Sequence, residues 1–349
     1  MYNGHSCSLL HIRSHAEGPM PLSSEHHRLL YRIAHAYYVR ELTQREIAER
    51  FRLSRPKVSR LLKQGRDEGI IDFVLVPPPG DLADLEHQLE TRYGLEEVVV
   101  VATTDPQDPV SVSRQLGPAG AECLIRSLKD HGTLAMSWGT TLRSVIEALP
   151  ARSWPHTQVV QMLGGLGDPA AESHGVDLTY RMAESLGARP RPVLSPGVVA
   201  NRTVRDALLA DPQVRGTLNL AASADVAIVG IGVPIAGSVV MRAGILTEAE
   251  VADLVERGAV GDIALRFIDA WGEPVEHRIN GRTIGLELEA IIRIPRVIGV
   301  AGGAEKRDVI RAALRGRLVD VLVTDQATAE ALTEEAIHAE SRRREAPAL

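Results

Sequence analysis

The spacing of hydrophobic residues predicts two short helices near the start of the chain. Within residues 25–40, apolar side chains at helical spacing form one stripe, Leu29, Leu30, Ile33, Ala34 and Tyr37. Thr43 and Glu46 then have the three-residue separation of a capping box, which begins a second helix. We expect the inner face of this second helix to carry Ile47, Ala48 and Phe51.

A third helix is predicted after a tight turn at Arg52 and Leu53. Ser54 is placed to cap it, and Pro56 falls in its first turn, where a missing N–H costs little. Its apolar positions are Val58, Leu61 and Leu62, and its polar side carries Arg55, Lys57, Ser59, Arg60 and Lys63. Residues 69–76 then indicate a turn and a short apolar strand, consistent with a wing.

From Glu97 onward, apolar runs rich in β-branched residues alternate with amphipathic segments. The runs are 98–103, 133–139, 158–164, 226–232, 297–303 and 320–325. The helical patterns lie near 111–130, 141–149, 174–187, 201–210, 247–257, 305–315 and 326–338. This alternation predicts an α/β domain with a parallel sheet covered by helices on both faces. Residues 262–286 are expected to form an antiparallel insertion with a turn at Gly272.

A boundary separates these two regions. Residues 77–80, Pro-Pro-Pro-Gly, stop any regular element. The segment after them places four apolar side chains on one helical face, Leu82, Leu85, Leu89 and Tyr93. This seam is about two heptads long, too short for an independent coiled coil. Two interpretations stay open: the helix pairs two subunits, or it packs on its own C-terminal domain.

The charge of the chain is unevenly distributed. With 349 residues, 44% hydrophobic and 24% charged, the chain suits two globular domains or three small ones. The net charge is −6, yet residues 28–66 hold eleven basic and three acidic side chains, a net +8 that leaves −14 elsewhere. A cationic module on an acidic body is typical of a protein that binds a polyanion.

Two capped helices, a tight turn and a basic outer face together predict a DNA-binding helix-turn-helix, with a three-helix bundle of charged surface as the alternative. The N-terminal half of the second helix of such a motif enters the major groove. Arginine there can bond guanine, and Ser54 with the helix N-terminus suits phosphate. Whether Arg55, Lys57 and Arg60 contact bases or phosphates stays open. The residues expected to contact double-stranded DNA are Thr43, Gln44, Ser54, Arg55, Pro56, Lys57, Ser59 and Arg60.

Small residues follow several predicted strands, at the edge where parallel sheets bind ligands. These loops are Ser137–Thr141, Gly164–Gly167, Gly230–Gly232 and Gly302–Gly303. Glycine permits close backbone approach, helix N-termini attract phosphate, and Thr140 and Thr141 add hydroxyl groups. Lys306, one of four lysines beside 35 arginines, follows the last loop. We predict a phosphate site here. Ordinary turns with a surface lysine are the alternative, and Trp138 suits either the core or a ligand platform.

Other chemistry has little support. The sequence has no Walker A motif, no complete G-x-G-x-x-G after the first strand and no G-x-S-x-G elbow, so no nucleotide cofactor is expected. Cys7 and Cys123 cannot make a disulfide framework, and no metal is expected because zinc-type spacing is missing among His5, His11, His15, His26 and His27. No run reaches the ~18 apolar residues of a membrane span, and no secretory pattern begins the chain. We therefore expect a cytoplasmic protein without a membrane partner.

We divide the chain at the composition changes. Residues 1–22 are expected to be a flexible polar leader, with Met20 as an alternative start of translation. The helix-turn-helix domain takes residues 23–78 and a linker helix residues 79–95. The α/β domain covers residues 96–338, and residues 339–349 are expected to be a flexible tail.

The sequence of residues 42–71 resembles a known helix-turn-helix, that of bacterial SorC/DeoR-type sugar-responsive transcriptional regulators. The matching letters are LTQREIAERFRLSRPKVSRLLKQGRDEGII. The second half is similar to the effector domain of this family over MSWGTTLRSVIEAL, QMLGGLG, GILTEAEV, GAVGDIALRFID and residues 205–232 and 296–332. The resemblance covers roughly residues 25–336. It implies an effector domain folded like sugar-phosphate isomerases, a phosphorylated sugar as ligand, and a homodimer or homotetramer.

The resemblance also implies effector-binding residues. Gly139, Thr140 and Thr141 match the phosphate loop of the family, Lys306 matches the lysine of its last glycine loop, and Asp262 matches an acidic position near the sugar. The expected set is completed by Arg242, Gly164, Gly165, Gly230 and Gly232. Some relatives have arginine or a longer polar stretch where this chain has residues 163–165, which favours a monophosphate or an unphosphorylated polyol over a bisphosphate. His174 stands where relatives often have small amide-bearing residues, so the sugar end has no assigned residue.

The sequence thus predicts a ligand-responsive DNA-binding regulator and not an enzyme. One rival is a sugar-phosphate isomerase-like enzyme with a DNA-binding appendage, in which Asp262 or His174 would be the general base. A second rival is a recombinase. That activity would require a nucleophile arranged for strand transfer, and the C-terminal half shows no such pattern.

Overall fold

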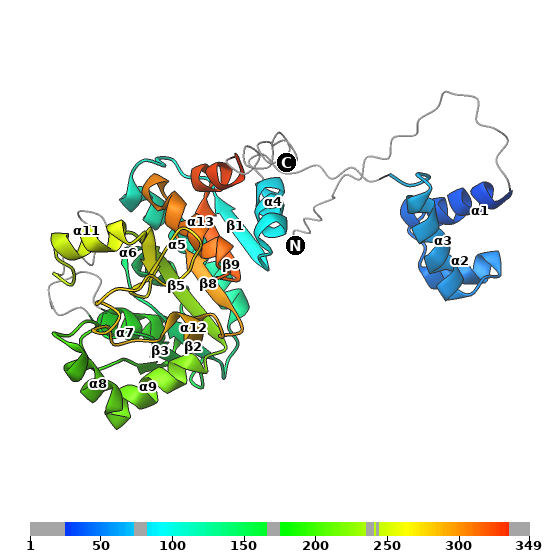
Figure 1. Ribbon diagram of the computed structural model, residues 1–349. Coiled ribbons are helices and arrows are strands. Elements are labelled where there is room, and N and C mark those ends of the chain that lie inside the picture. The colour runs from blue at the N-terminus through cyan, green and yellow to red at the C-terminus, as the bar shows by residue number, and fades with distance from the viewer. Residues whose placement is uncertain (1–24, 73–81, 166–174, 235–240, 242–243, 335–349) are drawn as a thin grey trace, which may run out of the picture. The chain divides into compact units, whose positions relative to one another are not determined.

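The computed structural model describes residues 25–72, 82–165, 175–234, 241 and 244–334. The chain divides into two units, Met1–Pro79 and Gly80–Leu349. Each has its own hydrophobic core, a small one among helices in the first unit and a large one around a sheet in the second (Figure 1). The predicted combination of a helix-turn-helix with a parallel-sheet α/β domain is therefore confirmed.

In the described residues of the first unit, all regular elements are helices. Its elements are α1 (Glu25–Ala34), the π-helix η1 (His35–Val39), α2 (Gln44–Phe51) and α3 (Arg55–Asp67). The side chains that meet in its core are Leu30, Ile33, Ala36, Ile47, Ala48, Val58, Leu61 and Leu62. Arg52 ends α2 in the left-handed conformation (φ 55°), so the chain turns within two residues into α3.

Two details of this unit differ from expectation. The first helix is α-helical only to Ala34, and the five-residue π-helix η1 replaces its predicted last turn. The predicted strand after Gly69 does not begin at Ile70 or Ile71, which both lie in a bend, and residues 73–76 lie outside the described ranges. The wing therefore stays a prediction.

The second unit is built on a sheet of seven parallel strands. They are β1 (Glu97–Val101), β2 (Thr133–Met136), β3 (Gln158–Gln161), β4 (Arg189–Arg191), β5 (Val226–Gly232), β8 (Val297–Val300) and β9 (Val321–Asp325). Their order across the sheet is β1-β9-β8-β5-β2-β3-β4. The six predicted strands are confirmed. The edge strand β4 was not predicted because its sequence, Arg-Pro-Arg, has no apolar run.

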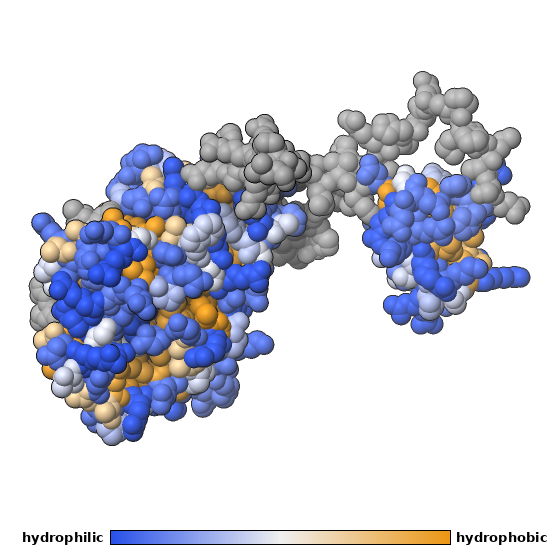
Figure 2. Space-filling model, in the orientation of Figure 1, coloured by the Kyte–Doolittle hydropathy of each residue, from blue (hydrophilic) through white to orange (hydrophobic). Residues whose placement is uncertain are grey.

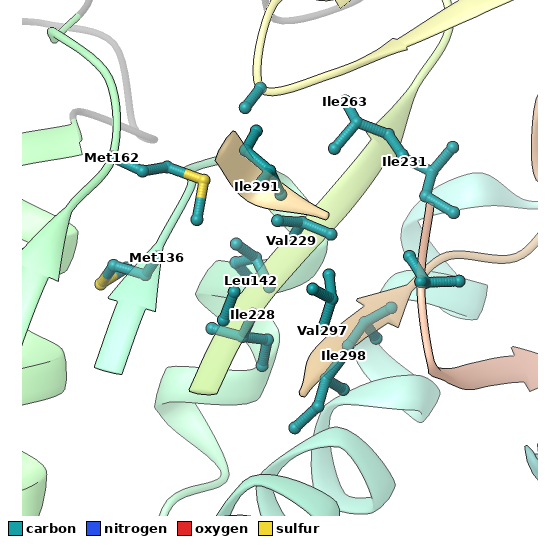
Figure 3. Close-up of a cluster of buried hydrophobic side chains, with 14 of the residues drawn as sticks. Met136, Leu142, Met162, Ile228, Val229, Ile231, Ile263, Ile291, Val297 and Ile298 are labelled. Carbon is teal, nitrogen blue, oxygen red and sulfur yellow. The ribbon is translucent and has the colours of Figure 1, made fainter. Parts of the chain in front are cut away.

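Helices connect these strands. They are α5 (Pro109–Ser127), α6 (Thr140–Glu147), α7 (Gly175–Leu186), α8 (Arg202–Ala210), α9 (Pro212–Ala222), α11 (Glu248–Glu256), α12 (Leu288–Ile291), the 3-10 helix η2 (Ala304–Lys306) and α13 (Arg307–Arg315). Residues 326–334 are also helical. Apolar side chains from neighbouring strands and helices interlock between these layers, among them Met136, Leu142, Ile228, Val229 and Ile298 (Figure 3).

The direction of the chain across the sheet reverses once. From β2 it proceeds to β3 and β4, and from β5 it proceeds the other way to β8 and β9. Because parallel crossovers are right-handed, α5, α6 and α7 cover one face, and α9 and α13 cover the other. The reversal lies between the adjacent strands β2 and β5. The carboxyl ends of two such strands form the usual ligand crevice of an open parallel sheet.

The predicted antiparallel insertion exists, with the predicted turn at Gly272 (φ 84°) and a further turn before it that the sequence did not indicate. Strand β6 (Gly261–Ile263) pairs with the end of β5 and with β7 (Arg266–Ile268), both antiparallel. The two-residue turn between β6 and β7 is Ala264–Leu265, with φ values of 52° and 63°. Alanine and leucine give no turn signal, so the sequence indicated only the turn at Gly272. That turn follows β7, where Ile268 and Pro274 form an antiparallel bridge.

Helix α4 (Ala83–Tyr93) packs on its own unit, as the second of the two interpretations of this segment predicted. Leu89 is fully buried in the large core. The backbone N–H groups of Val98 and Val100 donate to the carboxylates of Glu90 (3.0 Å) and Glu86 (2.8 Å). Helix α4 therefore covers β1, the edge strand of the sheet.

Candidate functional site

The outer face of α3 presents the residues that the sequence predicted to contact DNA. Val58, Leu61 and Leu62 face the core of the first unit. On the other side, Ser54, Arg55, Pro56, Lys57, Ser59 and Arg60 are all exposed. Within residues 25–72, no ion pair involves Arg55, Lys57 or Arg60. Figure 2 shows a largely hydrophilic surface over this unit. The face can therefore approach a polyanion without breaking internal contacts.

Thr43 and Gln44 begin α2. The Thr43 N–H donates to Glu46 Oε2 (2.8 Å), the Glu46 N–H donates to Thr43 Oγ1 (3.3 Å), and the Thr43 hydroxyl donates to Glu46 Oε2 (2.7 Å). The predicted capping box is thus confirmed. These hydrogen bonds from the Thr43 side chain and backbone hold the pKa of Glu46 below its usual value. Ser54 occupies the N-cap position of α3, but its side chain makes no capping hydrogen bond, so the predicted side-chain cap is wrong.

Two histidines that the sequence grouped with the polar N-terminal segment belong to α1. His26 Nε2 lies 2.8 Å from Gln64 Nε2, and His27 Nε2 lies 3.1 Å from Glu68 Oε2. Both contacts join the start of α1 to the end of α3. Both histidines therefore have a structural role in the packing of the two helices. The spacing of the histidines in the sequence gave no sign of this role.

The loop after β2 is at the reversal point of the sheet. The Gly230 N–H of β5 donates to Ser137 Oγ (3.2 Å), which ties this loop to the neighbouring strand end. Gly139 is the N-cap of α6 and has a φ of 146°, a conformation that favours glycine. Thr140 is exposed, whereas Thr141 is buried and its hydroxyl lies 3.2 Å from Ser113 Oγ. Of the two hydroxyl groups, that of Thr140 is therefore the more accessible.

Trp138 belongs to the scaffold of the site. It is 9% exposed, and its Nε1–H donates to the carbonyl of Gly164 (3.0 Å). The Gly164 N–H donates to Ile284 O (2.9 Å) and the Gly165 N–H to Ser195 O (2.9 Å). The backbone N–H groups of Gly164 and Gly165 are thus already paired within the protein. Gly164 also permits close packing of loops, because a Cβ there would collide with the carbonyl oxygen of Pro196.

A buried acid, Asp262, and a half-buried base, Lys306, interact electrostatically near the ends of β5 and β8. Asp262 is 8% exposed, and burial raises its pKa to about 6, although the Leu265 N–H and the charge of Lys306 favour the ionised form. Burial lowers the pKa of Lys306, while Glu305 and Asp262 act against that shift. The charges of Asp262 and Lys306 therefore depend on one another, as in many functional sites.

Asp325 also contributes to this edge of the sheet, and the sequence analysis missed its role. It ends β9 and is 1% exposed. Its Oδ1 accepts from the Gly303 N–H (2.8 Å) and from the Thr328 hydroxyl (2.6 Å). A Cβ on Gly302 would lie 2.3 Å from the same oxygen. Asp325 thus fixes the glycine loop that precedes Lys306. The residue follows an apolar strand directly, which is the signal that could have identified it.

Two predicted residues, Arg242 and His174, lie outside the described ranges. Among the described residues, no group of three or more His, Cys, Asp or Glu side chains could hold a metal ion. No helix in the described part of the chain is long and apolar enough to cross a membrane.

Comparisons with known proteins agree with this architecture. Residues 78–334 match the family described as a putative sugar-binding domain, and residues 20–81 match the MarR family. The chain is 33% identical to the deoxyribonucleoside regulator of Bacillus subtilis over 311 residues, which cover 89% of this chain and 99% of the relative. It is 30% identical to the erythritol catabolism regulatory protein of Brucella abortus over 308 residues, covering 87% and 96%. The crystal structure of the full-length sorbitol operon regulator SorC from Klebsiella pneumoniae matches with a TM-score of 0.69 and 32% identity, covering 89% of this chain and 100% of that one.

Proposed function

The chain belongs to the SorC/DeoR-type family of sugar-binding transcriptional regulators, and from this premise we propose that a phosphorylated sugar or polyol, bound at the carboxyl edge of the sheet, controls its grip on an operator. The observation that carries the proposal is the reversal point between β2 and β5. The Ser137–Thr141 loop and the coupled Asp262 and Lys306 charges lie around the strand ends there. An effector with an anionic end and several hydroxyl groups suits this combination of backbone N–H groups, a cation and a carboxylate.

On the DNA side, we propose that α3 enters the major groove. Arg55 and Arg60 are candidates for bidentate contacts to guanine, and Lys57 suits a phosphate as a point charge. Ser54 supports this arrangement, since its side chain is not used to cap α3. Thr43 is a weaker candidate because its hydroxyl is engaged by Glu46. Its backbone and Gln44 still begin a helix that crosses the DNA backbone in such motifs.

The effector must bind two states of the protein with different affinities in order to regulate it. We propose that these states differ in how subunits of a homodimer or homotetramer present α3 to two half-sites, because operators with two-fold symmetry call for symmetric proteins. Such a protein works where the DNA is, and we place it in the cytoplasm. The relatives are transcriptional regulators, which favours this function over the isomerase-like enzyme.

One experiment tests both halves. A duplex selected from a random pool by the full-length protein serves as the operator probe. Sorbitol, erythritol and deoxyribonucleosides, together with pentose and hexose monophosphates, are then screened by thermal shift and by their effect on binding of the duplex. A ligand at 100 times its Kd adds about 2.7 kcal/mol of stability, which a thermal shift detects readily. The proposal fails if no duplex is preferred, or if no compound changes both the midpoint and DNA binding.

The hydroxyl groups of the α6 loop provide a sharper variant. Thr140→Ala together with Thr141→Ala should abolish the response to the compound found in the screen and leave ligand-free DNA binding intact. Ser113→Ala is the matched control because it removes the partner of Thr141 without removing either threonine. A response that survives the double substitution would exclude this loop from the effector site.

A further inference from the structure

We propose that Gly232 and the backbone N–H of Leu265 are positioning groups that hold the Asp262 carboxylate in a single orientation. In this arrangement Oδ2 is tied to the β6–β7 turn, and Oδ1 lies over the bare Cα of Gly232. The consequence for effector binding rests on the proposed function. The orientation itself can be tested without any ligand.

Gly232 is needed for space. It pairs directly with Asp262 in the antiparallel ladder between β5 and β6. A Cβ at position 232 would lie 2.5 Å from Asp262 Oδ1, and the three nearest atoms that it would meet all belong to Asp262. The backbone of Gly232 does not have a positive φ, so conformational freedom does not explain the glycine. Any larger residue there would displace the carboxylate.

The turn holds the other oxygen. The Leu265 N–H donates to Asp262 Oδ2 (2.9 Å). Ala264 and Leu265 both have positive φ, and both side chains are buried, at 8% and 2% exposure. A turn of this kind normally uses Asn-Gly, and a non-glycine residue in this region is strained. The hydrogen bond to Asp262 offsets part of that strain, so the turn and the carboxylate fix each other.

The environment of Asp262 determines how the stability of the protein depends on pH, and this dependence reveals the orientation of the carboxylate. Lys306 from the loop after β8 interacts with it electrostatically, and Glu305 interacts with Lys306 in turn. Because burial makes the ionised carboxylate the costly form, ligand-free stability should fall as the pH rises through about 6. A carboxylate displaced towards water would lose most of this dependence. A change that merely loosened packing would lower stability at every pH and leave the slope unchanged.

The test is a double-mutant cycle on the ligand-free full-length protein. The stability of each variant is measured by thermal unfolding between pH 4.5 and pH 8. Gly232→Ala should lower the midpoint by about 3–8 °C at pH 5, the expected size of an overpacking cost, and flatten the pH profile. In the Asp262→Ala background, where the colliding side chain is missing, the same change should lower the midpoint by less than about 1 °C. In the Asp262→Asn background, which keeps the shape of the side chain, the drop should return.

Gly216→Ala is the matched control. A Cβ on Gly216, in α9, meets no atom within 4 Å, so this change should leave both the pH profile and the cycle unaffected. An equal loss for Gly232→Ala with and without Asp262 would overturn the proposal, as would an unchanged pH slope. Failure of every sugar to bind would contradict the proposed function alone, because the unfolding cycle contains no ligand. If a sugar phosphate does bind, Gly232→Ala should raise its Kd by about tenfold or more.

Discussion

A capping box begins α2 in the helix-turn-helix unit, and another begins α11 in the α/β unit. In the first, the Thr43 N–H donates to Glu46 at 2.8 Å, and in the second the Thr247 N–H donates to Glu250 at 3.0 Å. Glu46 is exposed, whereas Glu250 is 5% exposed and also accepts from Arg282 Nη1 at 2.7 Å. Four residues thus fix the local geometry of the motif, and the surrounding fold decides what its carboxylate does.

The same contrast separates the two candidate sites. The basic side chains of α3 are exposed to solvent, so a negatively charged partner molecule can reach them. Asp262 is buried and Lys306 is half-buried, and the charge of each affects the pKa of the other. Salt should therefore act mainly on the first site, because solvent ions screen exposed charges. Protons should act mainly on the second.

The largest expected effect on stability comes from replacing the buried carboxylate of the α11 capping box, and it tests the contrast with the exposed carboxylate of the α2 capping box. Burial raises the pKa of Glu250, but Thr247 and Arg282 outweigh burial and hold it below its usual value. Glu250→Gln leaves Arg282 without its ion-pair partner and should cost about 3 kcal/mol or more in unfolding free energy. Glu46→Gln should lower the midpoint far less. Equal losses in urea unfolding would show that burial is not what distinguishes the boxes.

The second effect has the opposite sign. The pKa of Asp262 rises from 3.8 to about 6 on folding, which at 1.36 kcal/mol for each pH unit corresponds to roughly 3 kcal/mol. That stability is present at low pH and is lost as the pH rises through 6. Asp262→Asn should therefore stabilise the protein at pH 8 and remove the dependence. Glu250, whose pKa is lowered, loses its contribution as the pH falls instead. A profile of Asp262→Asn parallel to the unsubstituted protein would contradict the assignment.

The third effect is expected from replacing the exposed basic side chains of α3. It should change DNA binding and leave the stability of the protein unchanged. Arg55→Ala or Arg60→Ala should cost about 1–3 kcal/mol in binding of the selected duplex if the side chain reads a base pair. A phosphate contact would instead weaken all duplexes alike and lower the salt slope. The thermal midpoint should not move, since both side chains are exposed. Arg189→Ala on the exposed edge of β4 is the control, and unchanged affinity and preference in both α3 variants would refute the recognition helix.

The smallest expected effect on stability comes from the N-cap threonines, the feature that the two capping boxes share. Thr43→Ala and Thr247→Ala each remove one side-chain acceptor from a helix start, and each should cost about 1 kcal/mol. Thr→Ser at either position keeps the acceptor and serves as the control. A loss at Thr247 several times that at Thr43 would mean that the hydroxyl, and not the carboxylate alone, depends on its surroundings.

The helix-turn-helix could be predicted nearly residue by residue because its signals are local. A cap, a turn and a stripe each involve residues within a few positions, and the parallel strands were visible for the same reason. Helix α9 was missed even though Asp211 and Pro212 form a strong start signal, with the Asp211 carboxylate accepting from the Val214 N–H (3.2 Å). The π-helix η1 has no signal of this kind.

The candidate effector site was predicted less completely because it joins strands far apart in the sequence. The sequence indicated glycine loops, but not that Trp138 would bond Gly164 or that Asp325 would fix Gly303. Nor could it show that the turn beside Asp262 would be made of alanine and leucine. These features depend on which strands become neighbours, and the order of strands in a sheet leaves little trace in any single segment.

The covering of β1 by α4 restricts how copies of this protein can assemble. An uncovered outer strand presents free amides that another chain can extend into a continuous sheet. Here the backbone N–H groups of Val98 and Val100 already donate to Glu90 and Glu86. Another chain therefore cannot extend the sheet at the border formed by β1. Any oligomer must then meet this border through helices and loops. Such contacts can separate without breaking the hydrogen bonds of a β-ladder.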